Sequence, residues 1–240
     1  MTVGQESICR VCPHRKDSVF SELTESRLEE WCNLKTVTLY RKDQRVFYES
    51  EPSLGLHIVC SGRVKLSRSS PMGRKQILAI EEPCGLLKEN DLFRSERHTV
   101  TAEAMDESVV GFVTRDDFHA FLRKNPSVAL RMLDHLAVEL ERVEDTLHSF
   151  VTMDVTRRLA DLLLRLADRH GRAIPEGRLI DVALTREEWS EMIGTTPETV
   201  IRVLSAFRKG GMIAEHDKRV ILLDEGRLKR TACYGAPSSG

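Results

Sequence analysis

The charged side chains best suited to molecular recognition lie on one segment near the C-terminal end, from Leu184 to Gly211. Glu198 and Arg202 are four residues apart there, so they project from the same side if this part of the chain is helical. An arginine can donate two hydrogen bonds to O6 and N7 of guanine, and a glutamate can accept one from a cytosine amine. The pair therefore favours recognition of base edges, not a covalent reaction.

A second pair, Cys9 and Cys12, lies near the other end of the chain in the sequence Cys-Arg-Val-Cys. The chain has six cysteines, and in a cytoplasmic protein such thiols more often serve in metal binding, in redox chemistry or in the core than in structural disulfides. Basic neighbours raise the reactivity of a thiol. The pair is a candidate metal site (iron–sulfur cluster or zinc) or a reversible disulfide, and its basic neighbours are Arg10, His14, Arg15 and Lys16.

The base-reading pair requires a scaffold, and the sequence predicts two short helices for it. Thr185 and Glu188 have the spacing of a capping box at the start of the first helix. Gly194 ends that helix, because glycine adopts the left-handed conformation of a helix end at little cost. The second helix begins at Thr195 or Thr196.

The second predicted helix is amphipathic. Its buried stripe consists of Val200, Val203, Leu204 and Phe207, and the opposite face is largely polar. A helix, a turn and a helix of this kind are typical of helix-turn-helix proteins, whose second helix lies in the DNA major groove. Residues 212–223 add a predicted β-hairpin wing. The candidate DNA-binding residues are Thr185, Arg186, Thr196, Pro197, Glu198, Thr199, Ile201, Arg202, Ser205, Lys209 and Lys218.

Composition favours a soluble protein of two domains. The chain has 240 residues, of which 41% are hydrophobic and 30% charged. No apolar run approaches the roughly 20 residues of a membrane span, and no secretory signal is visible, so we expect a cytoplasmic protein without membrane contact. No nucleophile elbow, phosphate-binding loop or metalloprotease spacing is present, and we expect neither catalytic residues nor enzymatic activity.

Net charge gives no general argument for nucleic acid. It is −1 for the whole chain, with 15 Lys+Arg against 13 Asp+Glu from Val151 onward and 21 against 24 before it. Any DNA affinity must then come from the local placement of basic side chains. Those in the C-terminal part are Arg202, Arg208, Lys209, Lys218 and Arg219.

The first half of the chain predicts a sensory β-domain. Short alternating runs from Leu34 to Val113, separated by turns such as Pro83-Cys84-Gly85, predict an antiparallel β-roll. The fold class is therefore α+β. We expect a cysteine-bearing arm at 1–20, the β-roll at 21–125, a dimerisation helix at 126–150, the winged helix-turn-helix at 151–230 (with a loop at 171–178) and a flexible tail at 231–240.

The long helix carries an apolar residue at alternating spacings of four and three. This heptad pattern predicts a seam that pairs the helix with a copy of itself. Packing on the chain's own β-domain is the alternative, and the two interpretations are compatible. The seam residues are Leu133, Leu136, Leu140, Val143 and Leu147, flanked by Ala129 and Phe150.

The order of β-roll, long helix and winged helix-turn-helix resembles the Crp/Fnr family of bacterial transcription regulators. The resemblance is carried by Ser61–Leu66, Leu92–Phe118 and Leu184–Ile213. It implies a homodimer that binds double-stranded DNA at a two-fold symmetric operator, contacts RNA polymerase and responds to a signal through the β-roll. A cyclic-nucleotide-gated regulatory subunit acting on a protein partner would share the β-roll but not the winged segment.

The family's Glu-Thr-Val-Ser-Arg motif corresponds to residues 198–202, which makes Glu198 and Arg202 the implied base-reading residues. Ile201 replaces the usual serine, and Pro197 stands where cyclic-AMP-type regulators carry an arginine. The resemblance thus favours an operator of the Fnr type, TTGA…TCAA. The alternative role for Glu198 is to act as the capping partner of Thr195.

The implied effector segment, which runs from Glu82 to Thr99 between two strands of the roll, departs from the family pattern. Members that bind a cyclic nucleotide use a Gly-Glu pair for the ribose and an Arg-Ser or Arg-Thr pair for the phosphate. Gly85 is followed here by Leu86, and Arg97 by His98, so we do not expect a cyclic nucleotide to be the signal, although it stays the alternative. The candidate effector-pocket residues are Gly85, Leu86, Leu87, Arg97 and Thr99.

The cysteine pair resembles the start of the Fnr cluster motif. A cluster usually requires four thiolates. The family's third and fourth cysteines fall near Ser18 and at Gly111, and neither is cysteine in this chain. A cluster would have to recruit other thiols, and the signal stays open between a cluster, zinc and direct thiol oxidation. The substitutes available are Cys32, Cys60 and Cys84.

Overall fold

The computed structural model describes residues 12–94 and 96–233. These fall into two compact units, one ending at Leu140 and the other beginning at Glu141. Among the described residues, no helix combines the length and the apolar character that a bilayer span needs.

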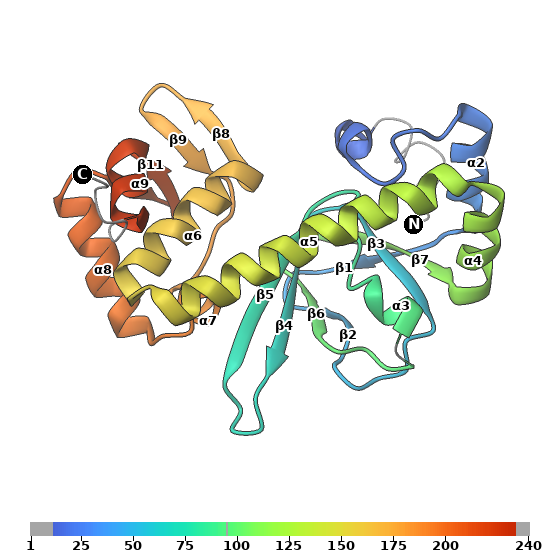
Figure 1. The fold of residues 1–240 in the computed structure, drawn as a ribbon, viewed down its shortest axis with the longest axis horizontal. Coiled ribbons are helices and arrows are strands. Elements are labelled where there is room, and N and C mark those ends of the chain that lie inside the picture. The colour runs from blue at the N-terminus through green and yellow to red at the C-terminus, as the bar shows by residue number, and fades with distance from the viewer. Residues whose placement is uncertain (1–11, 95, 234–240) are drawn as a thin grey trace, which may run out of the picture. The chain divides into compact units, whose positions relative to one another are not determined.

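The first unit is an antiparallel β-roll, as predicted (Figure 1). One sheet has the strand order β1-β7-β3 and the other β2-β6-β4-β5. Because neighbouring strands are antiparallel throughout, short turns suffice to connect many of them. The strands are β1 (Thr36–Tyr40), β2 (Arg45–Phe47), β3 (Gly55–Ser61), β4 (Val64–Ser69), β5 (Lys75–Glu81), β6 (Thr101–Ala104) and β7 (Ser108–Thr114).

Helices complete the core of this unit. Phe20 stacks on Trp31 with ring centroids 4.4 Å apart, and the Trp31 ring also meets Phe118 and Phe121. Val19 and Phe20 are buried in this cluster, so the end of the predicted arm belongs to the hydrophobic core. The helices are η1 (Pro13–Asp17), α2 (Glu25–Leu34), α3 (Asn90–Arg94) and α4 (Arg115–Lys124).

The long helix α5 (Pro126–Thr152) begins in the first unit and ends in the second. Val128 and Met132 are buried in the core that contains Trp31, which accounts for its first turns. Leu133, Leu140 and Leu147 lie on the predicted seam and are 59–64% exposed in the single chain. Packing on the β-roll therefore uses other residues of α5 and leaves this apolar row uncovered within the single chain.

The second unit combines helices with a four-stranded sheet of order β10-β11-β9-β8. Leu159, Leu162, Leu163 and Leu166 form a buried stripe along its first helix. The predicted wing is the β10–β11 hairpin. The elements are α6 (Val155–His170), β8 (Gly171–Ile174), β9 (Gly177–Ile180), α7 (Arg186–Ile193), α8 (Pro197–Lys209), β10 (Ile213–His216), β11 (Arg219–Leu222) and α9 (Glu225–Cys233).

Two parts of this unit differ from the prediction. Residues 171–178, interpreted as a loop, form most of the β8–β9 hairpin, because β9 pairs with β11 of the wing and thereby gains a partner distant in sequence. Gly177 fits this pairing closely, since a Cβ atom there would lie 2.1 Å from the Leu222 carbonyl oxygen. The chain also stays helical beyond residue 230, where the tail was expected to begin. Ala232 is buried in α9, while residues 234–240 lie outside the described part.

Candidate functional site

The first helix of the predicted pair begins with the expected capping box. The Thr185 hydroxyl accepts a hydrogen bond from the Glu188 N–H at 3.2 Å, and Glu188 Oε2 accepts one from the Thr185 N–H at 2.9 Å. Each side chain thus satisfies a backbone donor that the helix cannot satisfy itself. The Thr185 side chain is therefore engaged within the protein, although its predicted role also included DNA contact.

Gly194 ends α7 in the left-handed conformation, with φ 65° and ψ 50°, as predicted. Its missing side chain also matters for packing, because a Cβ atom at this position would lie 2.7 Å from Cε1 of Phe150. Arg158 donates to the Ile193 carbonyl oxygen at 3.2 Å and stacks over the Phe150 ring at 5.1 Å. The turn between α7 and α8 therefore rests directly on the last turns of α5.

The second helix, α8, has the predicted amphipathic pattern. Its N-cap is Thr196, whose hydroxyl accepts from the Thr199 N–H at 3.4 Å. Val200, Val203, Leu204 and Phe207 are buried and confirm the predicted stripe. On the opposite face Ile201 is 51% exposed, and Glu198, Arg202 and Lys209 are exposed as well. Pro197, Thr199 and Ser205 are half-buried beside them.

The Glu198 carboxylate is oriented locally at the start of α8. Hydrogen bonds from its own backbone N–H and from the Thr196 hydroxyl hold the pKa of this carboxyl below its usual value. The side chain remains exposed, so it is ionised at neutral pH and accessible to a ligand. The N-cap of α8 is Thr196, not Thr195, so Glu198 lies two residues after the N-cap and not at the third position, which the capping partner of a capping box occupies.

Among the other basic candidates, Arg186 differs from the exposed ones because it has a close acidic partner. Its Nη2 atom lies 2.6 Å from Glu215 Oε1 on β10, and Arg208 Nη1 lies 3.6 Å from Oε2 of the same carboxylate. Lys218 is exposed at the tip of the wing, where it adopts a φ of 62°. Sequence reasoning missed the role of Glu215, because a pairing across 29 residues has no local signal.

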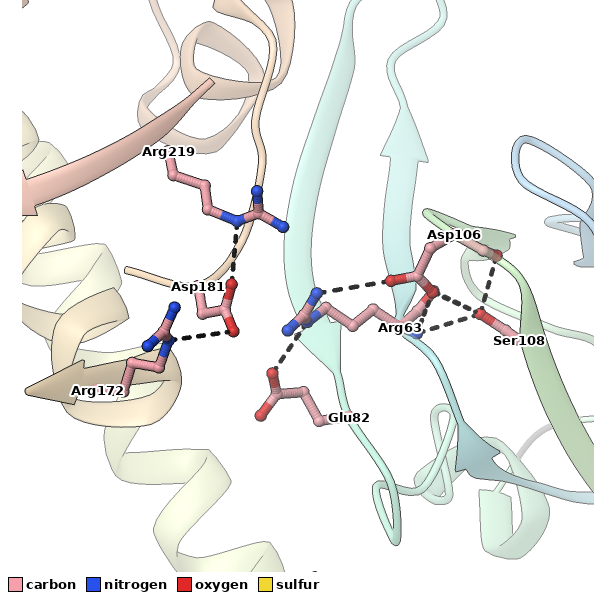
Figure 2. Close-up of polar contacts among 7 residues, drawn as sticks. All are labelled: Arg63, Glu82, Asp106, Ser108, Arg172, Asp181 and Arg219. Atoms are coloured by element: carbon pink, nitrogen blue, oxygen red, sulfur yellow. Dashed lines mark hydrogen bonds and ion pairs between the residues drawn. The ribbon is translucent and has the colours of Figure 1, made fainter. Parts of the chain in front are cut away.

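A second carboxylate, Asp181, pairs with Arg219 next to the tip of the wing. Asp181 follows β9 and lies 3.0 Å from Arg219 Nε on β11 and 3.8 Å from Arg172 Nε on β8 (Figure 2). Arg219 was named among the basic groups that could supply DNA affinity, and this ion pair reduces its availability. Lys218 is therefore the basic wing residue that stays directed to solvent.

The effector segment begins at the turn after β5, and Arg63 holds Glu82 at the start of this turn. Arg63, which follows the Ser61-Gly62 turn, donates to Glu82 Oε1 at 3.1 Å and lies 3.5 Å from Asp106 Oδ2 (Figure 2). The Arg63 backbone N–H also donates to Asp106 and to Ser108, at 2.8 and 3.1 Å. These contacts tie the turn after β5 to the turns around β4 and β7.

The five candidate pocket residues are not brought together as a phosphate site. Leu86 and Leu87 are buried, and Gly85 has the Glu81 carboxylate 2.7 Å from where a Cβ atom would lie. Arg97 is exposed and donates to the Ser50 carbonyl oxygen at 2.7 Å. Thr99 faces a different group, described next. A buried phosphate needs a cationic partner and free backbone donors, and this arrangement does not fit one.

Asp91 of α3 occupies the donors of Thr99. Its carboxylate accepts from the Thr99 N–H and from the Thr99 hydroxyl, both at 2.9 Å, and it is 2% exposed. Burial acts to raise the pKa of Asp91, but His98, these two donors and the charge of Lys88 outweigh it, so the pKa lies below the usual value. The buried Asp91 carboxylate therefore already occupies the two Thr99 donors that a bound phosphate would require.

Three rings fill the interior of the roll next to this carboxylate, which sequence reasoning missed. His98 stacks on Phe47 with centroids 3.7 Å apart, and His57 lies 5.0 Å from Phe47. Burial, reinforced by the nearby His98, lowers the pKa of His57 from 6.5 to about 4. The His98 Nδ1 atom is 3.8 Å from Asp91 Oδ2, an electrostatic contact beyond hydrogen-bond distance.

The same segment contacts α5 through a buried carboxylate. Glu89 Oε1 lies 3.1 Å from Nε2 of His135 on α5, and Glu89 is buried. The hydrogen bond that His135 donates to Glu89 raises the pKa of His135 more than partial burial lowers it, and the charges of Glu89, Glu139 and Glu81 act in the same direction. The segment from Cys84 to Glu89 is therefore linked to the long helix within the first unit.

The structure relates one of the two N-terminal cysteines to a thiol that the sequence could not assign to it. Cys9 lies outside the described residues. Cys12 Sγ is 3.2 Å from Cys84 Sγ, and Cys60 lines the same small cavity. Within the described part of the chain, no group of three or more His, Cys, Asp or Glu side chains could hold a metal ion. Cys32, named as a substitute cluster ligand, is buried in the hydrophobic core.

Comparisons with known proteins agree with the two-part architecture. A family model described as a Crp-like helix-turn-helix domain matches residues 157–231, and one for a cyclic nucleotide-binding domain matches residues 37–125. The chain is 33% identical to a CRP-like cAMP-activated global transcriptional regulator of Mycobacterium tuberculosis, over 80% of this chain and 86% of that protein. It is 27% identical to the transcriptional activator protein FnrL of Cereibacter sphaeroides, over 93% of this chain and 91% of FnrL.

Solved structures give the same picture. The structure of FixK2 from Bradyrhizobium japonicum matches with a TM-score of 0.74 and 26% identity, and the match covers 84% of this chain and 99% of FixK2.

Proposed function

Because the chain belongs to the Crp/Fnr family of transcription regulators, we propose that it binds a two-fold symmetric operator as a homodimer and that thiol oxidation is its signal. The observation that carries the DNA-binding part is the outward face of α8. Glu198, Ile201 and Arg202 are exposed there, while the stripe behind them is buried. A helix with this face, following a capped helix and a left-handed turn, suits insertion into a major groove.

The three exposed side chains favour an operator of the TTGA…TCAA type. Arg202 would donate to guanine O6 and N7, and Glu198 would accept from the amine of the neighbouring cytosine. Ile201 would contact a thymine methyl group, because an apolar side chain offers no hydrogen bond. Lys209 and Lys218, both exposed, would contact phosphates and position the helix. In such a regulator the bound dimer would also contact RNA polymerase.

A direct test measures operator affinity by fluorescence anisotropy. The probe carries TTGA and TCAA half-sites with centres about 10 base pairs apart, to match one turn of DNA. The matched competitor has the same base composition with both half-sites scrambled. We expect tighter binding to the operator probe at every salt concentration. Equal affinity for both duplexes would refute sequence-specific recognition.

Dimerisation is proposed through the exposed seam of α5. Leu133, Leu140, Val143 and Leu147 are 59–64% exposed in the single chain and recur at heptad spacing. Such a row suits burial against a second copy of itself, since large contiguous apolar patches are uncommon on monomers.

Sedimentation of Leu140→Asp tests this seam. Two buried carboxylates per dimer should raise the dissociation constant by about 100-fold or more. Val138→Asp is the matched control, because Val138 is exposed on the same helix but two residues away from the seam. A Leu140→Asp protein that stays dimeric at micromolar concentration would contradict the proposed interface.

A response to a cyclic nucleotide is the second candidate signal. It is favoured by the match of residues 37–125 to the cyclic nucleotide-binding domain and by the mycobacterial relative named as cAMP-activated. The buried Asp91 and the positions of Leu86 and Arg97 argue against it for this chain. Isothermal titration with cAMP distinguishes the two candidate signals. Saturable heat release would show that the chain binds cAMP and would favour the nucleotide over thiol oxidation as the signal.

A further inference from the structure

Two thiols from distant parts of the sequence lie in contact in the first unit. Cys12 Sγ and Cys84 Sγ are 3.2 Å apart, although 72 residues separate them along the chain. A disulfide bond is about 2.05 Å long, so the sulfur atoms would have to approach by only about 1 Å. Neither Cys12 nor Cys84 is part of a disulfide in this structure.

Both thiols are carried by anchored backbone, so their contact does not depend on two mobile segments meeting. Cys84 has a φ of 72°, its N–H donates to the Val59 carbonyl oxygen at 2.8 Å, and the preceding Glu82 is held by Arg63. Cys12 precedes η1, and its carbonyl oxygen accepts from the Arg15 N–H at 3.2 Å. The stack of Phe20 on Trp31 then fixes the segment that follows η1.

The thiol pair faces a small cavity that limits what can react with it. The cavity has a volume of about 20 Å³ and is lined by Cys12, Cys60, Cys84, Arg15 and Trp31, among others. This space accommodates about one water molecule. Both sulfur-bearing residues are half-buried, so a small oxidant can reach them while a large one is hindered. Hydrogen peroxide, which has two heavy atoms, is such a small oxidant.

We propose that Cys12 and Cys84 form a reversible disulfide, with hydrogen peroxide as the oxidant and a low-molecular-weight thiol as the reductant. One thiolate attacks the O–O bond and becomes a sulfenic acid, and hydroxide leaves. The second thiol attacks the sulfenic sulfur, the S–S bond forms, and the sulfenic oxygen leaves as water with the proton of this thiol. The hydroxide becomes water with the proton that the first thiol lost when it ionised. Two thiols and one peroxide thus give one disulfide and two waters. Two reductant thiols reverse the reaction by exchange and leave as their own disulfide.

The bond would restrain the effector segment. Two residues after Cys84 come the buried Leu86 and Leu87. Glu89 follows two residues later, and its carboxylate accepts a hydrogen bond from His135 on α5 at 3.1 Å. Linking Cys84 to the segment that begins at Cys12 therefore changes the constraints on a turn connected to the long helix. This regulatory consequence rests on the proposed function, whereas the disulfide itself does not.

Peptide mapping of the full chain tests the bond, because trypsin places all six cysteines on different peptides. Cys12 falls on VCPHR (residues 11–15), Cys84 on QILAIEEPCGLLK (76–88), and Cys9 on the peptide that ends at Arg10. The protein is treated with hydrogen peroxide, alkylated with iodoacetamide, digested without reductant and analysed by mass spectrometry.

We expect the linked pair VCPHR and QILAIEEPCGLLK, lost after treatment with dithiothreitol. It should be absent in Cys12→Ser and in Cys84→Ser but retained in Cys60→Ser, which removes the neighbouring thiol of the same cavity. A link between the Cys9 and Cys12 peptides, a link to the Cys60 peptide, or full alkylation of Cys12 and Cys84 would overturn the proposal.

Operator binding by the same samples separates this proposal from the proposed function. The reduced and oxidised proteins should differ in operator affinity by about fivefold or more, the lower range of allosteric coupling, and the difference should vanish in Cys84→Ser. If the linked peptide forms but both forms have one affinity, the regulatory part fails while DNA binding stands. If neither form prefers the operator, the proposed function fails while the mass spectrum still decides the disulfide.

Discussion

The start of α8 and the effector segment both concentrate polar side chains, but they use them in opposite ways. At α8, the side chains of Thr196 and Glu198 bond to groups within three residues and stay exposed. In the effector segment, Asp91 and Glu89 are buried; Asp91 bonds to Thr99, eight residues further along, and Glu89 bonds to His135 on α5. The first arrangement leaves hydrogen-bonding capacity for a ligand, whereas the second consumes it in holding the domain together.

This difference separates the expected effects of substitution. Changes on the exposed face of α8 should weaken DNA binding with little loss of stability, because few contacts of the folded chain are removed. Changes at the buried carboxylates should lower the stability of the first unit and leave the DNA-contacting face of α8 intact. The two tryptophans allow the units to be followed separately, since Trp31 is buried in the first and Trp189 in the second.

The largest effect is expected for Asp91→Ala. This change leaves the N–H and hydroxyl of Thr99 without their buried acceptor, and we expect it to lower the free energy of unfolding of the first unit by about 2–4 kcal/mol. Urea unfolding followed by Trp31 fluorescence, in a Trp189→Phe background, measures it. Asp116→Ala, at an exposed position of α4, is the control. A loss below about 1 kcal/mol would remove the contrast between the two regions.

The next prediction concerns acid. The pKa of His57 is lowered to about 4 in the folded state, whereas its ordinary value is 6.5. Between these two pH values the unfolded chain binds a proton at His57 and the folded chain does not. Folding stability should therefore fall as the pH drops from 6.5 to about 4, by roughly 2–3 kcal/mol from this group. His57→Phe should remove that part of the pH dependence.

The acid prediction is measured as the difference in unfolding free energy between wild type and His57→Phe, with Trp31 as the reporter. The difference should shift in favour of the variant as the pH falls. His148→Phe makes the same change at an exposed position of α5 and controls for the loss of a histidine. A difference that does not change with pH would show that His57 is not the buried base described.

Arg202→Ala should act on DNA and not on the fold. We expect operator binding to weaken by about 1–3 kcal/mol and the preference at one guanine to relax. Arg202→Lys keeps the charge but loses the two-pronged geometry, so it should recover phosphate-type affinity without the guanine preference. Equal weakening on operator and scrambled DNA by Arg202→Ala would instead identify Arg202 as a phosphate contact.

The smallest effect is expected for the helix caps. Thr185→Ala removes a capping box with hydrogen bonds of 3.2 and 2.9 Å and should cost about 1 kcal/mol of stability in the second unit. Thr196→Ala should cost less, because its bond to the Thr199 N–H is 3.4 Å long. Unfolding followed by Trp189 in a Trp31→Phe background compares the two, and an equal or larger loss at Thr196 would contradict this ranking.

The sequence predicted best what short-range patterns determine. The capping box, the end of α7 at Gly194 and the buried stripe of α8 each depend on residues a few positions apart, and all three are confirmed. The β-roll was predictable as a class from its alternating runs and regular turns. The operator sequence, the dimer seam and the base-reading roles stay predictions.

What the sequence missed depends on partners distant along the chain. Residues 171–178 became strands because β11, about 40 residues later, offers an edge to pair with β9. The meeting of Cys12 with Cys84, and of Asp91 with the rings of the roll, follows from closure of the β-roll, for which no local pattern exists. The departure at Leu86 was visible, but the internal carboxylate that bonds Thr99 was not.

The contact between Gly194 and Phe150 has a mechanical consequence. No side chain separates the inter-helix turn from the aromatic ring, so the two surfaces have no intervening layer that could absorb a shift. A rotation of the last turns of α5 would therefore displace the backbone at Gly194 and reorient the N-terminus of α8 by a similar amount. A methyl group added there would act as a permanent spacer and would tilt α8 away from the last turns of α5.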